Sequence, residues 1–142
     1  MKSIAQLLES KGGEIWSIGS DASVFEALGI MADKDVGALL VVDDGKLSGI
    51  ISERDYARKV ILMGHTSRQT RVWEIMTPQV HYISPERTVA DGLALMTDRH
   101  IRHLPVMDAG KLMGMVSIGD LVKEIIAEQR FEIEQLEQYI AG

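Results

Sequence analysis

The sequence contains an internal duplication, which limits its possible folds more than any other feature. When the chain is shifted against itself by 65 positions, residues 15–61 align with residues 80–126 without a gap. The identical pairs include Val24/Val89, Leu28/Leu93, Met31/Met96, Asp33/Asp98, Val41/Val106 and Asp43/Asp108. A period this long exceeds that of solenoid repeats, and two copies are too few for an array. The duplication therefore predicts two similar units related by a pseudo-twofold axis.

The apolar pattern predicts the same order of elements in both halves, and the fold class is α+β. The first half is expected to form a strand over 14–18, a helix over 24–33, strands over 38–42 and 47–51, and a helix over 52–62. The second half is expected to form strands over 80–83, 102–107 and 112–117, with a helix over 88–98 and a final helix. Because a unit of about 60 residues is only marginally stable alone, we expect the two β-α-β-β-α units to pack together and leave two related clefts.

The remaining segments complete the expected domain organisation. Residues 1–13 are predicted to hold a short helix over 3–10 that ends at Gly12-Gly13 and packs on the first repeat. The expected boundaries are 14–63 for the first unit, 64–75 for a polar linker that ends in a helical turn, 76–128 for the second unit, and 129–142 for an extension of the last helix. In that helix, steps of four and three separate Val122, Ile126, Gln129, Ile133, Leu136 and Ile140. This spacing is typical of a coiled-coil seam and predicts a partner helix, although the seam could instead pack on its own unit.

Composition narrows the classes of function. The chain has 142 residues, no cysteine and a net charge of -6, which favours a reducing compartment and predicts a cytoplasmic protein. No apolar run approaches the roughly 20 residues of a membrane span, and residues 1–4 lack the apolar region of a signal peptide. No basic stripe is available to neutralise phosphates of nucleic acid. We therefore expect neither a nucleic-acid nor a membrane partner.

Each half ends in the same short motif, a glycine, two apolar residues, a serine and, three positions later, an aspartate. The copies are Gly49–Asp55 and Gly114–Asp120, and each reads as a buried strand that runs into a helix. A helix N-terminus attracts anions such as phosphate, and an aspartate there can accept hydrogen bonds from the two hydroxyls of a ribose. The same Ser-x-x-Asp spacing also forms a capping box that satisfies the first helical N-H groups. The two interpretations are compatible.

With this duplicated unit and motif, residues 8–128 resemble a tandem pair of CBS domains, the regulatory modules named after cystathionine beta-synthase. The resemblance implies a non-enzymatic module whose clefts bind an adenine nucleotide, either AMP, ADP, ATP or NAD, with S-adenosylmethionine less expected. It also implies a homodimer that regulates another protein, of unknown identity, by altered packing. The alternative is a dimeric scaffold with vestigial pockets.

The resemblance also assigns residues to each site. At the second site it implies Asp120 on the ribose, Ser117 near ribose or phosphate, Arg102 and His103 near phosphate, and Thr77, Val80, Tyr82, Met115 and Val116 around the ligand. At the first site the corresponding residues are Asp55, Ser52, Arg54, Ile15, Ser17, Ile50, Ile51 and Lys11. The first repeat has the uncharged Gly37-Ala38 where the second has Arg102-His103, so its phosphate contact would depend on Arg54. Arg102 and His103 could also be a solvated strand edge, and Tyr82 an ordinary surface aromatic.

Two other classes of site are not supported by the sequence. His100 and His103 have no third ligand at a familiar spacing, so no metal site is expected. No Walker loop, nucleophile elbow or carboxylate pair with an obvious base is present, so we do not expect an enzyme.

Overall fold

The structure is a computed structural model that describes residues 1–12 and 14–141, and it divides into two compact units. One unit contains residues 14–81. The other joins the N-terminal residues to the segment that starts at Tyr82. Each unit therefore holds one repeat, and the α+β fold with two repeats is confirmed. Gly13, predicted to help end the first helix, lies outside the described residues.

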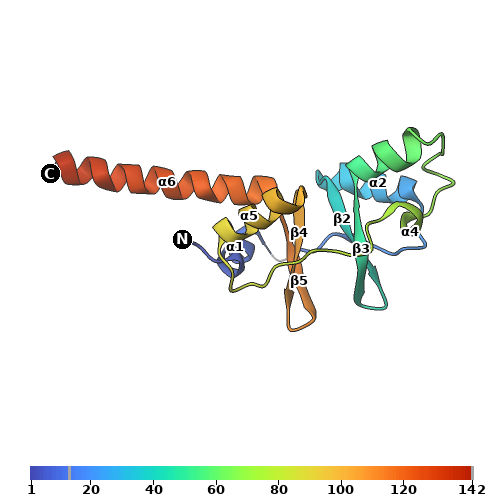
Figure 1. Cartoon of the computed structure of the whole chain (residues 1–142), viewed down its shortest axis with the longest axis horizontal. Helices are drawn as coiled ribbons and strands as arrows, with labels where there is room; N and C mark the ends of the chain where they lie inside the picture. Colours follow the sequence, from blue (N-terminus) through green and yellow to red (C-terminus); the bar gives the residue numbers. More distant parts are fainter. Residues whose placement is uncertain (13, 142) are drawn as a thin grey trace. The chain divides into compact units, whose positions relative to one another are not determined.

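The unit of residues 14–81 is built around a three-stranded sheet with the order β1-β2-β3. Its elements are β1 (Ser17–Ile18), α2 (Val24–Lys34), β2 (Ala38–Asp43), β3 (Lys46–Ser52), α3 (Glu53–Tyr56), the π-helix η1 (Ala57–Ile61) and α4 (Val72–Ile75). Strand β1 runs parallel to β2. Strand β3 runs antiparallel to β2 (Figure 1). Leu39, Val41 and Ile51 of the sheet pack with α2 and α4 in the core.

The predicted linker belongs to this same unit. The backbone N-H of Val24 donates to the Thr70 carbonyl at 2.8 Å, and that of Phe25 donates to the Ser67 carbonyl at 3.0 Å. The side chain of Thr70 is buried. The polar segment therefore packs against the start of α2, and the predicted helical turn that follows it is α4.

The second unit contains a two-stranded antiparallel hairpin with helices around it. Its elements are α1 (Ile4–Lys11), α5 (Val89–Arg99), β4 (His103–Asp108), β5 (Lys111–Ser117) and α6 (Ile118–Ala141). The predicted strand over 80–83 does not form. Only Ile83 pairs with the hairpin, where its N-H donates to Pro105 and its carbonyl accepts from Met107, both at 3.0 Å.

Helix α1 packs on the second repeat, which corrects the prediction that it packs on the first. Ile4 and Leu7 are buried in the core of the unit that contains α5 and α6. The backbone N-H groups of Ile4 and Ala5 donate to the carbonyls of Arg87 and Pro85 at 2.8 and 2.9 Å. These partners lie at least 80 positions away in the sequence, so the local pattern of α1 could not identify them.

The two repeats share unusual backbone features at equivalent positions. Helices α2 and α5 both end at a residue in the left-handed conformation, Asp35 and His100. Both hairpins turn through two residues of positive φ, Asp44-Gly45 and Ala109-Gly110, as a tight hairpin with the twist of the strands requires. A register shift follows Val41 in one hairpin and Val106 in the other. The duplication therefore extends to the details of the turns.

Candidate functional site

Both copies of the motif form the predicted junction between a strand and a helix. Strand β3 ends at Ser52 and α3 begins at the next residue, while β5 ends at Ser117 and α6 begins at the next residue. At each junction the serine and aspartate form the reciprocal hydrogen bonds of a capping box. The capping interpretation is therefore confirmed for both motifs.

At the second junction, the carboxylate of Asp120 also binds a lysine. Its Oδ2 atom accepts from the backbone N-H of Ser117 at 2.8 Å and from Lys11 Nζ at 2.7 Å. Lys11 Nζ also donates to the carbonyl of Met115 at 2.9 Å. Among the described residues, no donor is hydrogen-bonded to the other oxygen, Oδ1. This junction thus presents a fixed carboxylate with one free acceptor atom.

At the first junction, both oxygens of Asp55 are engaged within the unit. Oδ2 accepts from the N-H and the hydroxyl of Ser52 at 2.9 and 3.1 Å, and Oδ1 lies 3.2 Å from Lys59 Nζ. Lys59 also donates to the carbonyl of Ile75 at 2.8 Å. Sequence reasoning missed Lys59, although its i,i+4 spacing from Asp55 was a readable signal. The equivalent residue in the second repeat is Glu124, so the two junctions are chemically different.

The charges around the second junction affect each other's protonation. Burial raises the pKa of Asp120, but hydrogen bonds from Lys11 and Ser117, together with the charge of Lys11, hold this pKa below its ordinary value. Burial lowers the pKa of His103, the charges of Lys11 and Arg102 lower it further, and Asp120 opposes this. His103 pairs with Ser117 across the hairpin. Lys11, His103 and Asp120 therefore form one electrostatic cluster, with Arg102 exposed beside it.

We predict that His103 makes the stability of the protein depend on pH. Because its pKa is lowered in the folded chain, the unfolded chain takes up this proton first as the pH falls. The free energy of unfolding therefore decreases as the pH falls through the unfolded pKa of about 6.5. In His103→Gln this contribution is absent, so the melting temperature should fall less steeply on acidification through that value. His65→Gln, at an exposed position, is the control. The prediction would be contradicted if the melting temperature of His103→Gln fell with pH as steeply as those of wild type and His65→Gln.

Two predicted residues lie at the opposite junction from the one expected. Lys11 was assigned to the first site but binds Asp120 and Met115 of the second motif. Thr77 was assigned to the second site but exchanges two backbone hydrogen bonds with Ile50 of the first motif, at 2.9 and 3.0 Å. Each residue was assigned to the repeat whose first strand follows it in the sequence. In the structure, Lys11 and Thr77 instead contact the motif of the other repeat.

The two apolar residues of each motif, all four of them expected around the ligand, differ in burial. Ile51 and Val116 are fully buried in the cores of their own units. Alternate side chains of a strand point to opposite faces, so Ile50 and Met115 point away from these cores. Both are partly accessible.

The other predicted residues are accessible to different extents. Arg54, Ser17, Ile15 and Tyr82 are exposed, and Val80 is partly buried. Val80 and Thr77 belong to the unit of residues 14–81, whereas Tyr82, Ser117 and Asp120 belong to the other unit.

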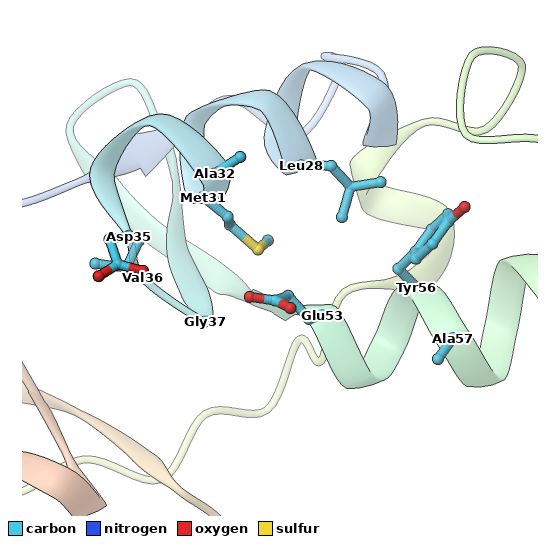
Figure 2. Close-up of a pocket in the computed structure, with 9 residues that line it drawn as sticks. All are labelled: Leu28, Met31, Ala32, Asp35, Val36, Gly37, Glu53, Tyr56 and Ala57. Carbon is cyan, nitrogen blue, oxygen red and sulfur yellow. The ribbon is translucent and has the colours of Figure 1, made fainter.

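A cavity of about 550 Å³ lies within the unit of residues 14–81 and was not predicted from the sequence. Leu28 and Met31 of α2 face Glu53 and Tyr56 of α3 across it, and Asp35 lies at one end (Figure 2). The cavity is lined by two acidic side chains and no basic one. Such a lining disfavours a phosphate group, and no predicted site residue is part of it.

Within residues 1–12 and 14–141, no group of three or more His, Asp or Glu side chains is arranged to hold a metal ion. None of the helices in this described part of the chain is both long enough and apolar enough to cross a membrane.

The comparison with protein families shows to which family this chain belongs. The model of the CBS domain matches residues 13–61 and 72–127, one match on each repeat. The chain belongs to the CBS domain family. Its two repeats form a tandem CBS pair, as the sequence predicted, and CBS pairs are regulatory modules.

The CBS pair is similar to proteins of several organisms. It is 42% identical to the CBS domain-containing protein CBSX3, mitochondrial, of Arabidopsis thaliana, over 98% of this chain and 72% of that protein. It superposes on a CBS-domain protein from Burkholderia ambifaria MC40-6 with a TM-score of 0.87 and 48% identity, covering 90% and 96% of the two chains. The CBS domain pair of protein MJ0100, with a TM-score of 0.78, 25% identity and coverage of 90% and 98%, was solved with 5′-methylthioadenosine and S-adenosyl-L-methionine.

Proposed function

We propose that this CBS pair is a non-enzymatic regulatory module that binds a phosphate-bearing adenine nucleotide at its second junction. One observation carries the proposal: the carboxylate of Asp120 is fixed by Ser117 and Lys11, with Oδ1 free among the described residues, in a cluster that also contains His103. A carboxylate is an acceptor-only group and suits the vicinal hydroxyls of ribose. Ser117 and the N-terminus of the 24-residue helix α6 stand beside it.

The basic side chains favour a ligand with a phosphate. Arg102 is exposed, His103 is partly buried next to Ser117, and Lys11 is within hydrogen-bond distance of Asp120. Hydrogen bonds between the cations Arg102 and Lys11 and a phosphate are stronger than neutral ones. The MJ0100 pair was solved with two adenosine derivatives that lack a phosphate. For this chain we propose AMP, ADP, ATP or NAD instead, with S-adenosylmethionine a weaker ligand.

Lys11 gives ligand binding a route to the rest of the module. It is the last residue of α1, and in the structure its ammonium bridges Asp120 and the carbonyl of Met115. A phosphate that draws Lys11 toward itself would change the position of α1 on its unit. A ligand shifts such an equilibrium only by its difference in affinity for the two arrangements, and the Lys11 contact can supply that difference.

We propose a weaker site at the first junction. Its counterparts of Arg102 and His103 are Gly37 and Ala38, and Lys59 already occupies the second oxygen of Asp55. A ribose would have to displace Lys59, and only the exposed Arg54 would remain to meet a phosphate. One tightly bound nucleotide per chain is therefore expected.

Isothermal titration with AMP and adenosine tests the role of the phosphate. Both ligands carry the same base and ribose, so their difference in affinity reports the phosphate contacts alone. We expect AMP to bind at least about tenfold more tightly, because a hydrogen bond to a charged group contributes about 1.5–3 kcal/mol. Titrations with ADP, ATP, NAD and S-adenosylmethionine then rank the ligands. No heat from any nucleotide at near-millimolar concentration would refute the proposed function.

The alternative is a dimeric scaffold with vestigial pockets, favoured by the exposed apolar residues of α6. A protein that dimerises but binds none of these nucleotides would support it. In either function the partner would be another protein rather than nucleic acid or a membrane. The absence of cysteine supports a reducing compartment, for which we propose the cytoplasm.

A further inference from the structure

The distal part of helix α6 carries apolar side chains that its own unit does not cover. Every residue from 129 to 141 is exposed, and the helix extends beyond the other elements of its unit (Figure 1). Ile133, Leu136 and Ile140 are 54%, 62% and 83% exposed. A helical segment of this length is marginal in water by itself. Apolar residues at this spacing therefore indicate a surface that packs on another helix.

A different face of α6 attaches the helix to its unit. Leu121 is buried and Ile125 packs against the core, while Glu124 and Glu128 lie 3.5 Å from Lys2 Nζ and the N-terminal amine. The seam residues are spaced four and three apart and lie on a neighbouring face: Val122, Ile126, Gln129, Ile133, Leu136 and Ile140. Val122 and Ile126 are 39% and 44% exposed even where α6 contacts its unit. The seam is thus free along its whole length.

A groove at the start of the seam differs in charge from the end of the helix. The groove has a volume of about 420 Å³, and its lining combines the small residues Gly119 and Ala127 with Val122, Ile126, Lys123 and Arg130. The distal segment, residues 131–141, contains Glu132, Glu134 and Glu137 and no Lys or Arg. The last turn of α6 has no basic residue to offset the negative end of the helix dipole. The groove and the distal segment are therefore complementary in charge.

We propose that α6 pairs in antiparallel orientation with α6 of a second copy of this chain. One register aligns every seam residue, with Val122 opposite Ile140 of the second copy, Ile126 opposite Leu136, and Gln129 opposite Ile133. Lys123 then lies opposite Glu137 of the second copy, near the end of its helix. The same register places Arg130 opposite Arg130 and Glu132 opposite Glu132 of the second copy, one like-charge pair of each sign, beside the two Lys123–Glu137 pairs. The parallel arrangement would instead place Glu132 beside Glu137 of the second copy twice, with no pair of opposite charge at these positions, and like charges there oppose pairing.

Cysteine cross-linking distinguishes the two orientations, because the chain has no native cysteine. In the antiparallel register, residue 126 of one copy meets residue 136 of the other. Two copies of residue 126 are then separated by ten helical residues, about 15 Å, which is beyond disulfide reach. A mixture of full-length Ile126→Cys and Leu136→Cys should form a disulfide between the two variants, and neither variant should cross-link alone. Self-linkage of Ile126→Cys, or no linkage in the mixture, would overturn the proposal.

A charge exchange provides an independent test without nucleotide, so its outcome does not depend on the proposed function. We expect Lys123→Glu to raise the dimer dissociation constant about tenfold, since two attractive pairs become repulsive. The double variant Lys123→Glu with Glu137→Lys should restore the wild-type value in sedimentation equilibrium. Lys111→Glu, at the exposed first residue of β5, makes the same charge change away from the seam and should have no effect. A wild-type monomer near 100 µM, the concentration scale of a weak dimer, or a double variant that fails to recover, would refute the pairing.

Discussion

Asp120→Ala should reduce the affinity for AMP by about a hundredfold, the largest functional effect that we expect from one substitution. The variant loses the charged acceptor for ribose and frees Lys11, and hydrogen bonds to charged groups are worth about 1.5–3 kcal/mol each. Without ligand, the cost should be only about 1–2 kcal/mol, for one helix cap and one partly exposed ion pair. Titration with AMP and urea unfolding of the same samples measure the two effects separately.

A matched control exists in the same unit. Thr88 and Asp91 form a capping box at the start of α5, with both reciprocal hydrogen bonds at 3.1 Å. Asp91→Ala therefore removes the same kind of cap at a place with no proposed ligand contact, and should cost about 1 kcal/mol of stability. Its affinity for AMP should stay at the wild-type value. If Asp120→Ala also keeps that affinity, Asp120 is a helix cap and nothing more.

Gly49→Ala should destabilise the protein by about 2–3 kcal/mol, as expected for overpacking of a closed site. A Cβ atom at position 49 would lie 2.7 Å from the carbonyl oxygen of Thr77 and 3.0 Å from Met76 Sδ. That carbonyl cannot retreat easily, because Thr77 is held to Ile50 by two backbone hydrogen bonds. Urea unfolding measures this loss of stability as a lower midpoint. If the two hydrogen bonds also break, the loss of stability should be larger.

Gly114→Ala is the control at the equivalent position of the second repeat. There the new Cβ atom would meet only the side chain of Leu8, with the nearest atom at 3.1 Å. A leucine side chain can shift by a few tenths of an ångström, so we expect a loss of stability below about 1 kcal/mol. Equal losses in the two variants would show that the approach of Thr77 is not what requires glycine at position 49.

The sequence predicted most of the fold correctly because the information is local and present twice. The Asp44-Gly45 turn, the helix over residues 24–33 and the Ser-x-x-Asp junctions were read from residue types at short spacing, and their equivalents 65 positions later supported each of them. The strand over 80–83 was an error of the same method. Alternating residues were present, but only Ile83 found hydrogen-bond partners on the hairpin.

The candidate site was predicted only in part, because its partners are distant in the sequence. Asp120 and Ser117 could be singled out from their spacing, and His103 from the family pattern. Lys11 could not be placed, since its contacts with Met115 and Asp120 span 104 and 109 residues. Ile51 and Val116 were grouped with their neighbours because strand alternation shows that two faces exist without showing which face meets the core.

The sequence by itself determined the repeat, the order of its elements and the capped carboxylates at the two junctions, because turns and caps depend on residues a few positions apart. Tertiary structure decided the rest. It placed α1 on the second repeat, set Lys11 against Asp120 and brought Thr77 to Gly49. These contacts join segments that no local pattern connects, and they form only when apolar residues from both ends of a unit are buried together. Two junctions with the same motif therefore have different chemistry in the folded chain.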